Sequence, residues 1–194
     1  MTSPDAVTLT PLDGFWPTSL SLRLGKAAPV ALQVIGPVSL LAARRTALFG
    51  STQTPGAAIL RAHDTARRLR DEGITLVGGF HSPLEKECFQ ILLRGDQPII
   101  ICLARTMAGM RIPTACQAAF EAGRLLFLSP FLTFPKRITR ESALRRSEVV
   151  AALADEVFFA HVTPGGHTAR MAEMIAAWGT PIIHPGTTPP STSD

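Results

Sequence analysis

One segment that reads as a strand, a tight turn and the start of a helix constrains the fold of this 194-residue chain most strongly. The short run Thr46–Phe49 breaks at Gly50, continues through Ser51 and Thr52, and leads into a helical pattern after Gly56. At the carboxyl edge of an open parallel sheet, such a turn directs backbone N–H groups and a helix dipole at an anion. We therefore predict a phosphate-binding turn at Gly50, Ser51 and Thr52.

The rest of the chain repeats the same alternation of short apolar runs and amphipathic helical patterns. Further strands are expected over residues 74–77, 98–103, 125–128, 156–162 and 181–183, and helices over 57–72, 83–93, 114–121, 142–154 and 167–178. Strands that alternate with helices at short intervals form a parallel sheet with helices on both faces. The prediction is an α/β fold, a Rossmann-like three-layer sandwich with a mostly parallel sheet, formed by residues 31–186.

The two ends of the chain have a different composition from this central region. Residues 1–30 are rich in Pro and Gly, and we expect an irregular leader with one short strand at Ser19–Leu24, where apolar and polar residues alternate. Residues 187–194 consist mainly of Thr, Pro and Ser, and we expect a disordered tail.

Composition narrows the class of protein but not its partner. The chain is 46% hydrophobic and 18% charged with a net charge of +4, a mild basic excess that suits phosphate ligands without requiring them. Three cysteines without CxxC spacing fit reduced thiols. There is no signal-peptide pattern and no apolar run of about 18 residues, so we expect a cytoplasmic protein without a membrane segment. No metal-ligand spacing, cofactor motif or catalytic triad is recognisable.

Two further glycine turns follow predicted strands. If the three turns lie on one sheet edge, they converge on one crevice and can contact the same phosphate. His167 could equally be a base, a phosphate donor or a solvated loop residue. The candidate phosphate contacts from these two turns are Gly78, Gly79, Gly165, Gly166, His167 and Thr168.

Charged side chains supply a second set of candidates. The densest basic run extends from Lys136 to Arg146, and we take Lys136, Arg137, Arg145 and Arg146 as phosphate ligands, with a solvated helix face as the alternative. Glu85, in the helix after the second turn, is a candidate for a ribose hydroxyl, although it also reads as ordinary charged helix surface.

The order of these motifs resembles the DNA-processing protein A family (DprA/Smf) of the SMF/LOG superfamily. The chain departs from the family pattern at three positions, where Thr52 replaces an Arg, Glu85 an Asp and Glu148 an Arg, so it resembles a divergent member. The segments that carry the resemblance are Ile35-Gly36, Leu40-Leu41, Phe49–Thr52, Gly79-Phe80, Leu84-Glu85, Ile112-Pro113, Ser129-Pro130, Phe134-Pro135, Arg145–Leu153 and Gly165-Gly166.

This resemblance implies a non-enzymatic homodimer that binds single-stranded DNA in a basic pocket and has a recombinase as partner. A second branch of the superfamily gives an alternative. Pro164–Thr168 together with Glu173 resembles the PGGxGTxxE signature of LOG nucleotide phosphoribohydrolases. In that branch the turn holds a nucleotide phosphate and the Glu attends the ribose, so the alternative is a nucleotide N-glycoside hydrolase or nucleotide sensor. A domain used only for protein contacts remains a third hypothesis.

Overall fold

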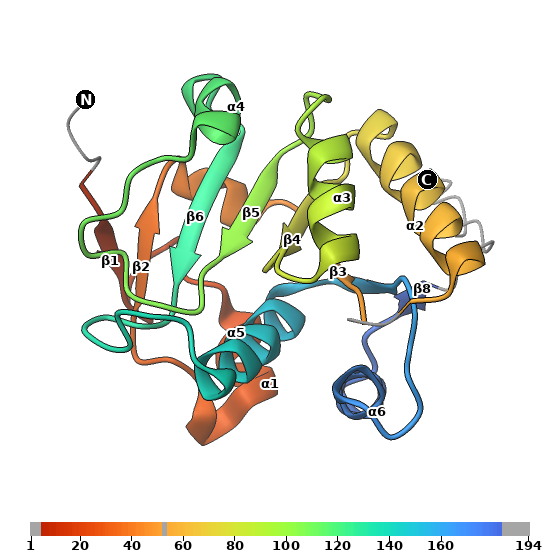
Figure 1. Ribbon diagram of the computed structural model, residues 1–194. Coiled ribbons are helices and arrows are strands. Elements are labelled where there is room, and N and C mark those ends of the chain that lie inside the picture. Colours follow the sequence, from red (N-terminus) through yellow and green to blue (C-terminus); the bar gives the residue numbers. More distant parts are fainter. Residues whose placement is uncertain (1–4, 52–53, 184–194) are drawn as a thin grey trace, which may run out of the picture.

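An eight-stranded sheet forms the centre of the molecule, as seen in a computed structural model that describes residues 5–51 and 54–183 (Figure 1). The strand order is β1-β2-β6-β5-β4-β3-β7-β8. The strands from β3 to β8 are mutually parallel, whereas β2 is antiparallel to β6 and β1 is antiparallel to β2. Their bounds are β1 Val7–Leu9, β2 Leu32–Ile35, β3 Arg45–Phe49, β4 Thr75–Gly78, β5 Ile99–Cys102, β6 Leu125–Ser129, β7 Glu156–Phe159 and β8 Ile182–Ile183.

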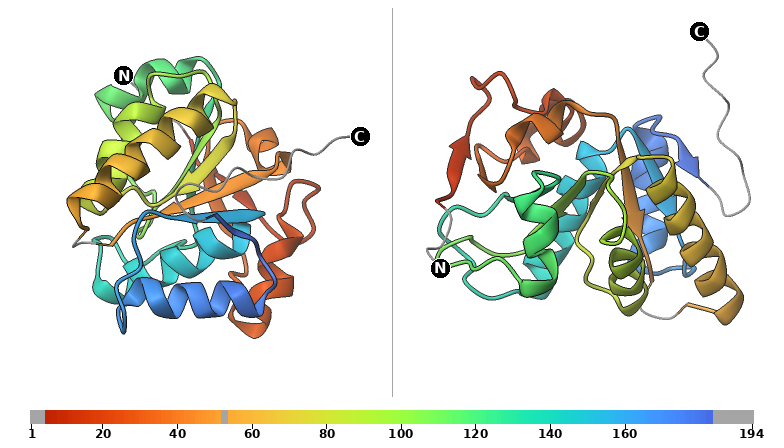
Figure 2. Two further views of the ribbon diagram at one scale, coloured as in Figure 1. Left: turned by 90° about the vertical axis from the view of Figure 1, so that its right-hand side faces the viewer. Right: turned by 90° about the horizontal axis from the view of Figure 1, so that it is seen from above.

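Helices cover both faces of this sheet and give three layers (Figure 2). On one face lie α2, α3 and α4, and on the other lie α1, α5 and α6. The predicted α/β fold with a mostly parallel sheet is therefore confirmed. The helix bounds are α1 Thr18–Leu24, α2 Gly56–Asp71, α3 Pro83–Leu92, α4 Gln117–Glu121, α5 Arg140–Leu153 and α6 His167–Ala177, with short 3-10 helices at η1 Gly25–Ala27, η2 Val38–Ala42 and η3 Thr114–Cys116.

The central strands are apolar along their whole length because both of their faces are buried. In β3, Ala47 and Phe49 pack into the core beneath α5 and α6, while Leu48 points to the opposite core beneath α2 and α3. Successive side chains of a strand point to opposite faces, so one short apolar run supplies both cores. This explains why the strands read as continuous hydrophobic segments in the sequence.

The connection order creates a switch point between β3 and β7. From β3 the chain adds β4, β5 and β6 in one direction, and then returns to place β7 on the other side of β3. The loops that leave β3 and β7 therefore diverge to opposite faces of the sheet. Ligands of open α/β sheets bind in the crevice that such diverging loops leave at the carboxyl edge.

The N-terminal region is more regular than expected. The prediction of a strand at Ser19–Leu24 is wrong, because these residues form most of α1. Leu20 and Leu24 are four residues apart and pack in the core that α5 covers, whereas the Leu22 side chain is 83% exposed. Alternating leucines also satisfy a helical period here, and the tertiary contact decides between the two. The tail at 187–194 lies outside the described residues.

Smaller differences concern element ends. The fifth predicted strand stops at Phe159 rather than residue 162, and the helix expected from residue 142 begins at Arg140. Thr139 caps that helix, since its side chain accepts a hydrogen bond from the Ser142 backbone N–H at 3.1 Å. Within 5–51 and 54–183, none of the helices has the length and apolarity that crossing a bilayer requires.

Candidate functional site

A cavity of about 380 Å³ lies at the carboxyl ends of β3 and β7, where the switch point predicts a ligand site. Its base is apolar and includes the rings of Phe49 and Phe159, which stack with their centroids 5.5 Å apart. Its polar lining comes from α5, α6 and the loop before α3. The basic and imidazole side chains that line it are His81, Arg140, Arg146, His167 and Arg170.

Arg146 is the buried arginine among those that line this cavity. Its side chain is buried, with the residue 9% exposed, and its guanidinium lies against the backbone of Gly79, where any Cβ would overlap it. Glycine at residue 79 thus leaves room for the guanidinium. Within the described residues Arg146 has no hydrogen bond and no ion pair. A buried cation without a partner is costly, and an anionic ligand would remove that cost.

Glu85 ties two of the turns around the cavity together. Its Oε1 accepts a hydrogen bond from the Gly50 N–H at 3.0 Å, and its Oε2 accepts from the N–H groups of His81 and Ser82 at 2.8 and 3.3 Å. Ser82 completes the capping box of α3 by accepting from the Glu85 N–H. Both carboxylate oxygens of Glu85 therefore accept hydrogen bonds from backbone N–H groups. The Gly50 N–H, a predicted phosphate donor, already has Glu85 as its acceptor.

A network of hydroxyl groups joins the turn after β3 to the turn after β7. Ser51 Oγ donates to the His161 carbonyl at 3.0 Å and lies 3.0 Å from Thr168 Oγ1. Thr163 contributes two bonds, from its hydroxyl to Ser51 Oγ and from its N–H to Thr168 Oγ1, each at 3.1 Å. The hydroxyls of Ser51 and Thr168 therefore fix the shape of the cavity wall.

His167, the first residue of α6, is a neutral group in a basic surrounding. Its Nε2 atom is buried without a hydrogen-bond partner among the described residues. Burial lowers the pKa of the imidazole, and the charges of Arg170 and Arg146 lower it further. The imidazole is consequently uncharged at neutral pH, and a bound anion would favour its protonation.

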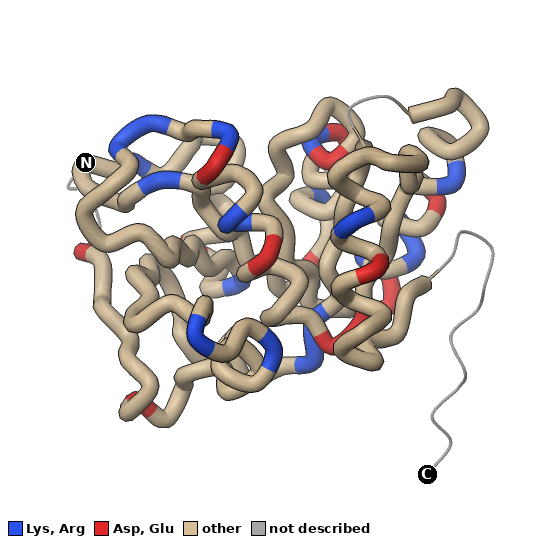
Figure 3. Tube along the Cα trace, turned by 90° about the horizontal axis from the view of Figure 1, so that it is seen from below, with Lys and Arg blue, Asp and Glu red and all other residues tan. Residues whose placement is uncertain are grey.

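Arg145 and Arg146, both predicted phosphate ligands, have different neighbours in the structure. Arg145 forms an ion pair with Glu148 at 3.0 Å and also donates to the Ala27 carbonyl, away from the cavity that Arg146 lines. Lys136 and Arg137 are exposed in the loop before α5 and do not line the cavity. Figure 3 shows Lys and Arg positions scattered among Asp and Glu positions, without one large basic face in that view. The positive charge at the cavity therefore comes from the few arginines that line it.

The predicted glycines have different positions relative to the cavity. Gly50 lines it, Gly79 supports Arg146, and Gly78 is buried beside the Phe80 ring. Gly165 adopts a left-handed conformation with φ of 68°, and Gly166 caps α6 just before His167. Thr52 lies outside the described residues.

Three of the basic and imidazole lining residues are not among the sequence-predicted candidates, namely His81, Arg140 and Arg170. Arg140 lies within the basic run from Lys136 to Arg146, and Arg170 follows His167 by three residues and therefore shares its helix face. That spacing is the signal that could have identified Arg170. Nothing in the sequence near His81 indicates its position.

The three cysteines are buried and unpaired by disulfides. Burial raises the pKa of Cys88 and of Cys102 to about 12, so both remain protonated thiols. In the part of the chain that the structure describes, no three His, Cys, Asp or Glu side chains are grouped as metal ligands would be.

Comparison with known proteins identifies the family. No curated protein matches the sequence. DprA from Streptococcus pneumoniae superposes with a TM-score of 0.77 at 19% identity, covering 98% of this chain and 66% of that one. DprA from Helicobacter pylori, described for its single-stranded DNA binding mode, gives a TM-score of 0.73 at 19% identity over 92% of this chain and 80% of that one. The model of the DNA recombination-mediator protein A family matches residues 7–183, and the chain therefore belongs to this family.

Proposed function

We propose that this protein binds single-stranded DNA and that one backbone phosphate occupies the cavity beside Arg146. The observation that carries this proposal is the buried guanidinium of Arg146, which has no counter-charge among the described residues and lies against a glycine. A guanidinium presents a planar set of donors that suits a phosphate group. Family membership supports the same ligand, because the Helicobacter protein is described as binding single-stranded DNA.

The surrounding residues determine what kind of binding this cavity supports. Arg140 and Arg170 line it but are exposed, where they can add long-range attraction for a strand. The apolar base at Phe49 and Phe159 limits the water that competes for the phosphate. Contacts to phosphate position a strand without reading its bases, so we expect little sequence preference.

The test is a titration of a labelled single-stranded oligonucleotide at several salt concentrations. Three arginines at the cavity predict that the logarithm of the affinity falls with the logarithm of salt concentration with a slope of roughly −2. Arg146→Gln should weaken binding, whereas Arg145→Gln removes the same charge from the adjacent, ion-paired position and should weaken it much less. Equal affinity losses in the two variants would contradict the proposed phosphate position.

Competition with AMP separates this function from the nucleotide hydrolase or sensor. Glu173, which the resemblance to LOG proteins implies at the ribose, is exposed and does not line the cavity. Both oxygens of Glu85 accept backbone hydrogen bonds. Neither the Glu173 nor the Glu85 carboxylate is therefore placed to act on a ribose in this cavity. We expect AMP to compete only weakly. Saturable AMP binding with release of adenine would overturn the DNA proposal.

The homodimer and the recombinase partner are further proposals that rest on the family. The chain spans 66% of the pneumococcal and 80% of the Helicobacter chain, so the assemblies of those proteins do not transfer directly. Light scattering of the purified protein measures the oligomeric state, and binding of a purified recombinase to the protein with and without oligonucleotide measures the second interaction.

A further inference from the structure

A second cavity, of about 260 Å³, lies at the opposite end of the sheet from the proposed DNA site. It forms where the segment before α1 packs beside the start of β3 and the residue that precedes β7. Its apolar walls come from Phe15, Pro17 and Leu41. Because Arg45 begins β3 and Phe49 ends it, the two cavities are separated by the length of that strand.

Three residues that line this cavity each carry a donor without a hydrogen-bond partner among the described residues. The indole Nε1 of Trp16, the hydroxyl of Ser19 and Nε of Arg45 are buried and make no hydrogen bond within the described residues. Trp16 is 7% exposed and Arg45 is 8% exposed, so bulk water does not satisfy these groups. Buried polar groups are almost always hydrogen-bonded in native proteins, and three unsatisfied donors around one cavity are exceptional.

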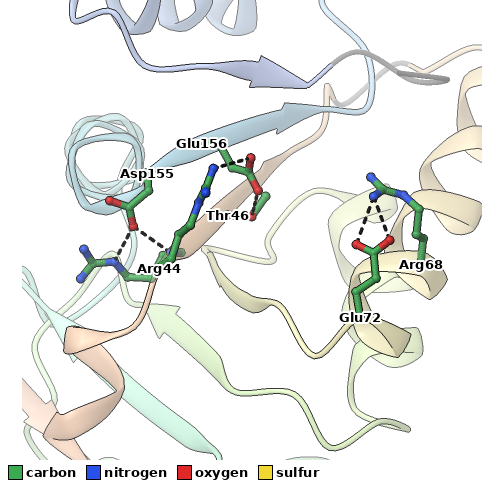
Figure 4. Close-up of polar contacts among 7 residues, drawn as sticks. Arg44, Thr46, Arg68, Glu72, Asp155 and Glu156 are labelled. Atoms are coloured by element: carbon green, nitrogen blue, oxygen red, sulfur yellow. Dashed lines mark hydrogen bonds and ion pairs between the residues drawn. The ribbon is translucent and has the colours of Figure 1, made fainter. Parts of the chain in front are cut away.

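Two other donors of Arg45 have hydrogen-bond partners. Its Nη1 donates to the Leu41 carbonyl at 2.5 Å, and its backbone N–H donates to Asp155 at 2.8 Å. The Asp155 carboxylate lies 3.6 Å from Nε, beyond hydrogen-bond distance. Figure 4 shows Asp155 at this end of β3 and β7, with Glu156 nearby but engaged by Arg44 and Thr46.

Burial, Asp155 and Arg23 act on the Arg45 guanidinium in different directions. Burial is the largest influence on the guanidinium and lowers its pKa, while the carboxylate of Asp155 opposes that shift. The nearby Arg23 lowers the same pKa further. The cavity therefore combines unpaired donors with the Arg45–Asp155 ion pair, and Arg23 is a second positive charge near Arg45, so the free donors favour a ligand that accepts hydrogen bonds.

We propose that this cavity binds a carboxylate group through Trp16, Ser19 and Arg45. A carboxylate is a flat monoanion whose two oxygens can accept several hydrogen bonds, which matches three donors around a small space. The apolar walls accommodate a short hydrocarbon body behind it. A phosphate dianion would face stronger repulsion from Asp155, which lines the same cavity.

The size of the cavity limits the ligand to a small carboxylic acid or one acidic side chain. At about 260 Å³ it lies just below the range of pockets for drug-sized ligands, about 300–1,000 Å³. This site does not depend on the proposed DNA function, since its residues are separate from those that line the cavity at Arg146.

The experiment follows the indole N–H signal of Trp16 by proton–nitrogen NMR. The chain has two tryptophans, so the Trp178→Phe variant assigns the two signals. The protein is titrated separately with acetate, with acetyl-glutamate amide as a model of an acidic side chain, and with inorganic phosphate, at constant ionic strength. We expect saturable movement of the Trp16 signal with a carboxylate and none with phosphate. Tighter binding of acetate indicates a free acid, and tighter binding of the blocked glutamate indicates an acidic side chain.

Ser19→Ala is the decisive variant, because the hydroxyl has no other hydrogen bond to lose. It should raise the dissociation constant of the carboxylate about tenfold, as expected for one hydrogen bond to a charged acceptor. Thr180→Val is the matched control, since Thr180 Oγ1 is likewise buried and unpartnered but does not line the cavity. No response to either carboxylate, a response to phosphate alone, or equal effects of the two variants would overturn the proposal.

Discussion

Two arginines are buried at opposite ends of the same sheet, and they differ in their partners. Arg45, at the start of β3, donates to the Leu41 carbonyl and has Asp155 at 3.6 Å. Arg146, beyond the carboxyl end of β4, lies against Gly79 with no acceptor among the described residues. The two are equally buried, at 8% and 9% exposure. Burial alone therefore does not distinguish an arginine that has an ion-pair partner from one that has none among the described residues.

The difference follows from which side chains connect neighbouring segments at each end of the sheet. At the amino end, Arg45 connects η2, β3 and the residue before β7, so its hydrogen bonds hold three segments together. At the carboxyl end, the same task falls to Glu85 and to the Ser51 hydroxyl network. Arg146 therefore makes none of the hydrogen bonds that connect these segments among the described residues. Removing it should cost the fold little, whereas removing Arg45 should cost it much.

The largest expected effect is on the stability of Arg45→Met. The change leaves Asp155 without its counter-ion and the Leu41 carbonyl without its donor, and we expect the free energy of unfolding to fall by about 3 kcal/mol. Urea denaturation measures it. Arg44→Met is the matched control, because its side chain is 65% exposed and its ion pair with Glu156 is long at 3.4 Å. The control should change stability by less than about 1 kcal/mol. Comparable losses would mean that Arg45 is not a structural partner.

Arg146→Met should reverse this pattern. An apolar side chain of similar length removes a buried cation, so stability should stay constant or rise. Single-stranded DNA affinity should fall about tenfold to a hundredfold, the value of one or two charge-assisted hydrogen bonds. Denaturation and oligonucleotide titration of the same preparation measure both quantities. A strongly destabilised variant would show that Arg146 has a structural partner after all.

Gly79→Ala tests whether the position of the Arg146 guanidinium matters, with its charge retained. The new methyl group would displace the guanidinium, which is the flexible end of a side chain, so the stability cost should stay below about 1 kcal/mol. Affinity for the oligonucleotide should fall roughly tenfold. Gly56→Ala, at the first position of α2 and with open space around its Cα, serves as the control. Unchanged affinity in Gly79→Ala would mean that the strand binds elsewhere.

Most of the fold could be predicted because the central strands are buried on both faces and therefore read as apolar runs. The short strands β1 and β2 are not among the predicted strands, and the leucines of α1 fit a strand period as well as a helical one. The carboxyl edge could be located because parallel strands bring their following turns together. Which arginine faces the cavity could not be predicted. Neighbouring helical residues point about 100° apart, and only the packing of α5 places Arg146 inward and Arg145 outward.

Glu85 shows a second limit of sequence reasoning. Its position after a glycine turn suggested a ligand contact, but its partners include Gly50, which lies 35 residues earlier. A hydrogen bond between two turns is set by the sheet topology and leaves no local pattern. The hydroxyls of Ser51 and Thr168 are a similar case, since they contact each other across 117 residues.

The smallest predicted effect is a pH dependence at His167. In the folded protein its pKa lies below the ordinary 6.5, because of burial and the charges of Arg170 and Arg146, which Glu148 and Glu85 only partly offset. The unfolded chain therefore takes up the proton first, so stability should decrease as pH falls through about 6.5 and be unaffected above it. A bound phosphate reverses this preference, since it favours the imidazolium.

DNA affinity should accordingly rise a few-fold, about 0.5–1 kcal/mol, between pH 7.5 and pH 5.5, in addition to any general electrostatic change. His167→Gln should abolish this rise, whereas His81→Gln, at an exposed imidazole lining the same cavity, should retain it. Titrations at matched ionic strength measure the difference. If the rise persists without His167, the phosphate does not contact α6, and the comparison between the two buried arginines would then rest on Arg146 and Gly79 alone.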